Sequence, residues 1–304
     1  MSFGKIVNGS FEIAWRHKLL WVFGLFAGGG GSIDVDMFPG NGWGSHRFDM
    51  EAAGFREAIE PFIGILTATL IVTVLLGAVI LLVCHLISVP ALIDSVNRIR
   101  RGDGHWKFGQ AFSTGIDFLL PMLGLILMAI FAGGAVVAVI VGVIIIAAQI
   151  GWVAAVLLGI MLFPVLLAAI WIISSIVNLT ERVMVVRRTG LGDALEEAFR
   201  LFRANLVDNL LIFLIEIAFI IAFSIAGLII FGIVAVPIAA LNLLAGSGWV
   251  ATVTALILVG IPLSLVVGGF TGTVSSNLYT LFYFELVEPS RATIPASSTP
   301  PAAV

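Results

Sequence analysis

Long runs of apolar residues, separated by short polar segments, occupy most of the chain. A helix needs about 20 apolar residues to cross about 30 Å of hydrocarbon, and only helices or closed barrels satisfy the backbone there. The runs lack the alternation of strands, so they predict transmembrane helices. Five full spans are predicted, at residues 61–89, 118–148, 152–178, 209–241 and 249–284.

Two of the runs are too long for one crossing and contain a break. The uncharged run 118–178 is interrupted at 149–152, and the run 209–284 is interrupted by the turn-like cluster 242–248. Each run therefore predicts a helical hairpin. Pro237 and Pro262 flank the second turn and are expected to kink their helices. Broken helices also build midplane sites in transporters, but shaping the bundle is the favoured reading.

The first apolar segment, at 19–30, is short and allows three interpretations. It follows Arg16 and Lys18 and runs into consecutive glycines, so it is a short crossing, a re-entrant piece or a signal peptide. The acidic Glu12 lies in the lead-in, which favours an uncleaved helix. We therefore predict a sixth, short span.

The distribution of basic residues predicts the orientation. With the N-terminus inside, all but two of the 15 Lys and Arg residues lie in cytoplasmic segments. The two others, Arg47 and Arg56, share an outer loop at 31–60 with several acidic residues. Both termini are thus expected in the cytoplasm, with 1–288 forming one transmembrane domain and 289–304 a disordered tail.

Composition supports this class of protein and excludes others. Hydrophobic residues make up 60% of the chain and charged residues 11%, against about 25% charged in soluble domains. A water-soluble fold is excluded. The net charge of −3 and the scattered basic residues do not support nucleic-acid binding. The single cysteine, Cys84, excludes an intramolecular disulfide.

The chain contains an internal repeat. Residues 92–102 align with 179–189, each with Leu, an acid two residues later, Val and then a double arginine. Phe3-Gly4 begins a similar stretch near the N-terminus. The predicted unit is an amphipathic cytoplasmic helix followed by two crossings, used three times.

The segment 191–206 illustrates such an amphipathic helix. Ala194, Ala198 and Phe202 fall on one face at helical spacing, whereas Glu196 and Arg200 form an i,i+4 pair on the other. The helix either lies at the membrane surface or packs on the protein itself. The sequence does not favour one of these two positions over the other.

One stripe of small residues predicts a helix-packing surface. Helices in lipid associate through close contact at small residues. The last predicted span carries such residues at strict four-residue intervals: Ser264, Gly268, Gly272 and Ser276.

Glu216 is the candidate functional residue within the spans. It is the one formal charge deep in a predicted crossing, and intramembrane ionisable groups are costly enough to be functional candidates. An interfacial position is the competing interpretation. His85 is a second candidate for transport or relay, near the cytoplasmic end of its span, although a structural histidine is favoured.

The sequence does not support a metal site, a cofactor or an enzyme activity. The acidic residues of the outer loop could supply oxygen ligands, but their spacing does not match an EF-hand. No cofactor-binding or catalytic motif is present, so we predict no metal, no cofactor and no enzyme activity.

Several short stretches carry a resemblance to a known class. The stretch 14–26, the loop 179–182, the helix 194–205 and the ending 280–285 together resemble widespread, uncharacterised prokaryotic polytopic proteins. These are similar to the membrane domain fused to some glycerophosphoryl diester phosphodiesterases. The resemblance implies a prokaryotic plasma membrane and no catalytic residues in this chain.

Two functions follow as hypotheses. The first is a non-enzymatic scaffold or accessory protein, whose partners are the lipid bilayer and either another membrane protein or a second copy of the chain. The alternative is a small-molecule or lipid permease that uses Glu216 in a bundle cavity. The fold expected in both cases is an all-α, polytopic bundle of about six spans with amphipathic interfacial helices.

Overall fold

The protein is all-α within the residues that the structure describes. The computed structural model describes residues 2–27, 53–103, 107–244 and 248–287. Most of the predicted outer loop and the predicted tail 289–304 lie outside these ranges. The described residues contain no strand and form nine helices: α1 (Phe3–Arg16), α2 (Leu20–Ala27), α3 (Ala53–Arg100), α4 (Phe108–Asp117), α5 (Leu119–Ile150), α6 (Trp152–Arg187), α7 (Leu191–Ala204), α8 (Leu206–Leu244) and α9 (Gly248–Val287).

Five of these helices are long and apolar enough to cross a membrane, which confirms the five full spans. Their candidate spans are Thr67–Arg100, Leu119–Ile150, Trp152–Arg187, Leu206–Asn242 and Ala251–Val287. The predicted sixth span differs, because the described helix α2 has 8 residues and is about 12 Å long, less than half the hydrocarbon thickness. The long helices also continue past the predicted span ends, since a helix need not stop where hydropathy falls.

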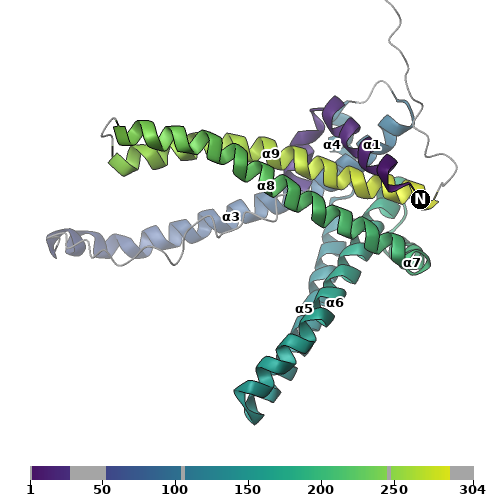
Figure 1. Ribbon diagram of the computed structural model, residues 1–304, viewed down its shortest axis with the longest axis horizontal. Helices are drawn as coiled ribbons and strands as arrows, with labels where there is room; N and C mark the ends of the chain where they lie inside the picture. The colour runs from purple at the N-terminus through teal and green to yellow at the C-terminus, as the bar shows by residue number, and fades with distance from the viewer. Residues whose placement is uncertain (1, 28–52, 104–106, 245–247, 288–304) are drawn as a thin grey trace, which may run out of the picture.

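The long helices form three arms that meet at one end of the molecule (Figure 1). One arm is α3, the second is the α5–α6 hairpin and the third is the α8–α9 hairpin, and the three diverge away from the meeting point. In the α5–α6 hairpin, Gly151 alone separates the two helices, inside the predicted break. We call the meeting point the hub: α1, α2, α4 and α7, packed on the C-terminal ends of α3, α6 and α9.

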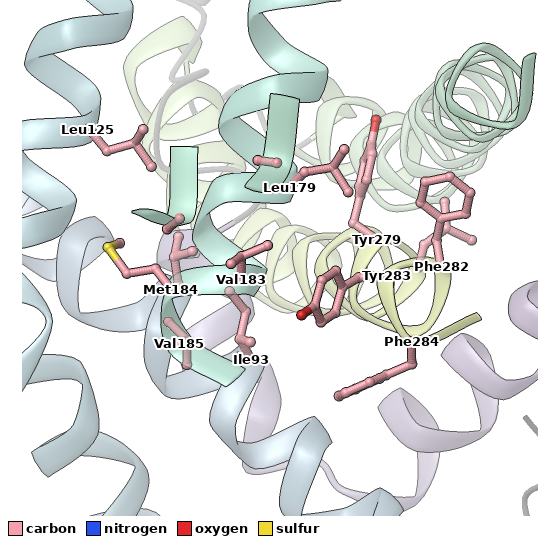
Figure 2. Close-up of a cluster of buried hydrophobic side chains, with 14 of the residues drawn as sticks. Ile93, Leu125, Leu179, Val183, Met184, Val185, Tyr279, Phe282, Tyr283 and Phe284 are labelled. Atoms are coloured by element: carbon pink, nitrogen blue, oxygen red, sulfur yellow. The ribbon is translucent and has the colours of Figure 1, made fainter. Parts of the chain in front are cut away.

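The hub has a well-packed interior. Figure 2 shows Leu179 and Val183 of α6 on the side of the aromatic residues of α9, whereas Met184 points to the opposite side, toward Leu125. Tyr283 and Phe282 of α9 are almost fully buried. The five apolar spans, by contrast, have 0–6% of their most hydropathic windows buried, so the hub holds the arms together.

Helix α2 docks into the hub against α9 through small residues. A Cβ added at Gly24 would overlap the Thr273 hydroxyl and the Gly269 carbonyl, and one at Gly269 would lie 2.7 Å from the Trp21 carbonyl oxygen. The Thr273 hydroxyl donates to the Leu20 carbonyl over 3.1 Å. The two backbones therefore approach each other as closely as glycine permits.

Helix α7 packs on the protein itself, one of the two predicted alternatives. Ala194, Ala198 and Phe202 are buried, and Phe202 lies against Trp171 of α6 with ring centroids 5.5 Å apart. Arg187 at the end of α6 forms an ion pair with Glu197, at 2.6 Å. The aromatic ring of Phe199, however, remains half exposed on the outer side.

Candidate functional site

A polar cavity lies where the three arms converge. It has a volume of about 210 Å³, enough for several water molecules or a small polar solute. Its wall combines side chains from the following positions on α2, α3, α6, α8 and α9: Ala27, His85, Val89, Ser174, Val177, Asn178, Glu181, Arg182, Glu216, Ser275, Ser276 and Tyr279. Both ionisable residues singled out from the sequence, Glu216 and His85, thus belong to one site.

The cavity lies at the level where the exposed apolar arms give way to the hub. On α3 the last exposed large apolar residue is Val83, and His85 follows two positions later. On α6 the same change occurs between Ile172 and Ser174. Large apolar side chains are exposed along α6 from Trp152 to Ile172, about 30 Å of helix, which equals the hydrocarbon thickness. The cavity therefore lies at one end of the apolar layer.

Glu216 enters the cavity from α8 and is held by two hydroxyl groups of α9. The Ser275 hydroxyl donates to Oε1 and the Tyr279 hydroxyl to Oε2, each over 2.6 Å. Ser275 and Tyr279 are four residues apart, so the same face of α9 presents both donors. The carboxylate is thereby fixed in orientation, and hydrogen bonds to a charged acceptor are stronger than neutral ones.

A buried ion pair on α6 forms the opposite wall. Arg182 is 3% exposed and its Nη1 lies 2.5 Å from Oε2 of Glu181. The same nitrogen donates to the backbone carbonyl of Asn178 at 2.8 Å and to its side-chain oxygen at 2.9 Å. The Arg182 guanidinium also lies 5.4 Å from the ring centroid of Tyr279, which links this pair to the donor of Glu216.

His85 contributes an imidazole ring that is hydrogen-bonded to the backbone of α2. Its Nδ1 lies 2.6 Å from the carbonyl oxygen of Phe26 at the end of α2. Because a carbonyl oxygen only accepts, Nδ1 carries a proton and donates it to this bond. The contact ties α2 to α3 at the edge of the cavity. The neighbouring Cys84 is a partly exposed free thiol and is not in the wall.

Two buried polar atoms of the wall have no hydrogen-bond partner in the described part of the chain. These are Nε of Arg182 and Oγ of Ser276. Buried polar atoms in native proteins are almost always satisfied, and both of these atoms are shielded from solvent, so a solute could bond them only after neighbouring side chains shift. The wall carries two carboxylates and one guanidinium, which suits a solute bearing a positive or a zwitterionic group.

Glu181, Arg182 and Tyr279 line the cavity, but the sequence pattern does not single them out as site residues. It placed the first two in a cytoplasmic loop because they follow the apolar run of α6. One available signal was helical spacing, because Ser174, Asn178 and Glu181 recur every three or four residues and so share one face of a helix.

The predicted stripe of small residues lies partly outside the close helix contact. Ser264 is exposed and donates to the Ile261 carbonyl of its own helix. A Cβ at Gly268 would be in ordinary contact with Leu25, at 3.7 Å. Gly272 is buried, and Ser276 lines the cavity. The closest approach occurs one position along from Gly268, at Gly269.

Among the described residues, no three His, Cys, Asp or Glu side chains are grouped to hold a metal ion. The acidic residues considered for calcium lie outside the described ranges. No protein-family model matches the chain, and neither a curated protein nor a solved structure shows significant similarity to it.

Proposed function

We propose that this chain is a multi-pass permease that binds a small polar solute, with an ammonium or zwitterionic group, in the cavity around Glu216. The observation that supports it is the meeting of Glu216, His85 and the Glu181–Arg182 pair from three arms in one cavity. Ionisable groups within membrane spans are costly, and a carboxylate held in a cavity has no evident use in a scaffold. A site at the junction of three arms also fits alternating exposure of a solute.

A binding screen followed by uptake tests this proposal. The purified chain is heated in mild detergent with choline, glycine or acetate, as representative cation, zwitterion and carboxylate. We expect choline or glycine, but not acetate, to raise the unfolding midpoint. The stabilising solute, radiolabelled, is then offered to proteoliposomes.

Glu216→Gln should lower uptake at least tenfold, because it removes the carboxylate of the cavity that has no ion-pair partner among the described residues. The matched control is Glu196→Gln, which alters an exposed glutamate of α7. Unchanged uptake by Glu216→Gln, or no response of the wild type to any of the three solutes, would contradict the proposal.

The proposal includes a topology and a repeat. Each of α1, α4 and α7 precedes two apolar helices, and each exposes an aromatic ring beside the arms: Trp15, Phe112 and Phe199. Aromatic residues concentrate at membrane interfaces. We infer three repeated units whose amphipathic helices lie at the cytoplasmic face of a prokaryotic plasma membrane. Both termini are then on the cytoplasmic side. Labelling single cysteines at positions 8 and 288 from either side of sealed vesicles tests this orientation.

The divergence of the arms favours a second candidate, the scaffold or accessory protein. The α5–α6 hairpin diverges from the other arms (Figure 1) and contacts the rest of the molecule chiefly at the hub, and large apolar side chains along it are exposed. A second copy or another membrane protein would then co-purify in mild detergent at fixed stoichiometry. Failure to recover any reproducible complex would count against this role. Neither candidate requires enzyme activity or a cofactor.

A further inference from the structure

A second hollow lies on the side of the hub that faces away from the apolar arms. Its volume is about 410 Å³, and it is formed by the C-terminal ends of α3 and α6. These are the two aligned segments of the repeat that end in a double arginine, residues 100–101 and 187–188. The fold thus brings two sequence-distant copies of one motif to the same hollow.

The first arginine of each pair is engaged with a neighbouring helix. The Arg100 guanidinium lies 4.1 Å from the ring centroid of Phe284 on α9. Arg187 forms its ion pair with Glu197 on α7. These two residues anchor the ends of α3 and α6 to the hub.

The second arginine of each pair has no such partner. Arg101 and Arg188 are exposed, line the hollow and form no ion pair with any described residue. The acids of the hollow are engaged instead: Asp94 binds Arg98 at 2.7 Å, and Asp103 has its own interaction within the chain. Two guanidinium groups therefore remain for an external anion.

The backbone of Arg188 is a second, independent observation. With φ 54° and ψ 40° it adopts the left-handed conformation at the end of α6, and it is the one non-glycine residue among those described with positive φ. Glycine is the usual residue at this position of a helix end. An arginine in this strained conformation motivates the hypothesis that its side chain does more than end the helix.

We propose that this hollow binds a phosphate group through Arg101 and Arg188. Guanidinium groups bind phosphate oxygens through paired, charge-assisted hydrogen bonds, and two of them match a doubly charged anion. Soluble phosphate compounds and the headgroup of an acidic lipid both carry this group. The hollow begins about 16 Å along α3 beyond Val83. The source of the phosphate group therefore determines whether the hub binds a soluble compound or a membrane lipid.

The test compares the wild type with Arg101→Gln/Arg188→Gln and with the control Arg200→Gln/Arg203→Gln, which changes exposed arginines of α7 outside the hollow. In one arm, inorganic phosphate is titrated against chloride of equal ionic strength, and the unfolding midpoint is followed. In the other arm, the unfolding midpoint is measured in nanodiscs of phosphatidylcholine alone and in nanodiscs in which phosphatidic acid makes up about a fifth of the lipid. We expect a saturable response in at least one arm, weakened at least tenfold by the hollow variant and unchanged by the control.

A response to phosphate assigns the soluble source, and a response to phosphatidic acid alone assigns the lipid. Equal responses from the wild type and the hollow variant, or none in either arm, overturn the proposal. Arg188→Gly separates binding from folding. It should raise the basal midpoint by a few degrees, because the strain is relieved, while weakening the response. A lowered basal midpoint would instead show that Arg188 is structural and overturn its assignment.

Discussion

The hydroxyl of Tyr279 on α9 donates a hydrogen bond to Oε2 of Glu216 on α8 over 2.6 Å. This contact joins the two helices of one arm at the hub, and Ser275 supplies the second donor to the same carboxylate. Glu216 is thus held in place by α9 while its side chain lines the cavity.

Removing the tyrosine hydroxyl should weaken the arm. We expect Tyr279→Phe to lower the free energy of unfolding by about 1–3 kcal/mol, because the carboxylate loses a charge-assisted bond in a buried site. Thermal or denaturant unfolding in detergent measures the loss. In the Glu216→Gln background the same change should cost clearly less, and an equal cost in both backgrounds would show that the two residues are not coupled.

Arg182 should be the least replaceable charge of the cavity. Arg182→Met is expected to destabilise the protein by about 3–5 kcal/mol, because it leaves Glu181 buried without its counter-charge. Adding Glu181→Gln should restore part of that loss. Arg203→Met, at an exposed position on α7, is the control and should change stability by less than about 0.5 kcal/mol. A double variant as unstable as Arg182→Met would contradict the pairing.

Adding a single methyl group where α2 contacts α9 should destabilise the protein. Gly24→Ala is expected to cost about 1–3 kcal/mol, because the new Cβ would overlap backbone and side-chain atoms of α9. At Gly133 of α5 a Cβ meets nothing within 4 Å, so Gly133→Ala should be neutral or stabilise the helix by up to about 1 kcal/mol. Only Gly24→Ala should therefore lower the unfolding midpoint, and an equal loss in both variants would refute the close approach.

Asp94 should control the attachment of α4. Its Oδ2 accepts from Arg98 of the same helix at 2.7 Å and from the Thr114 hydroxyl of α4 at 3.2 Å. Asp94→Asn is expected to speed amide hydrogen exchange in α4 several-fold and to leave α7 unchanged. Mass spectrometry of peptides covering the two helices distinguishes this from general loosening, in which both would exchange faster.

His17, between α1 and α2, predicts a pH dependence. Partial burial, and to a smaller extent the adjacent Arg16, lower the pKa of His17 below 6.5. The unfolded chain then binds a proton first as the pH falls below 6.5, so stability should decrease down to the folded-state pKa and stay unaffected above about pH 7. His17→Gln should remove this part of the pH dependence. Identical slopes for the two proteins between pH 7 and 5 would contradict it.

The long helices of the arms could be predicted from the sequence, but the way in which they converge at the hub could not. Uncharged runs predict the five long helices, and the break at 149–152 contains the single residue, Gly151, that separates α5 from α6. Hydropathy sorts residues by compartment, so it assigned Arg182 to a loop and Glu216 to a span. Their meeting in one cavity depends on how α6 packs against α9, which is a tertiary property that local pattern does not encode.

The concentration of contacts at the hub has a mechanical consequence. Because each arm is attached at its packed end, a small rotation there would move the far end of the arm by a larger distance. Turning an arm of about 50 Å by about 10° would displace its tip by ~9 Å, while side chains at the packed end shift far less. A small rotation at the hub would therefore change the spacing between the far ends of the arms by several ångströms.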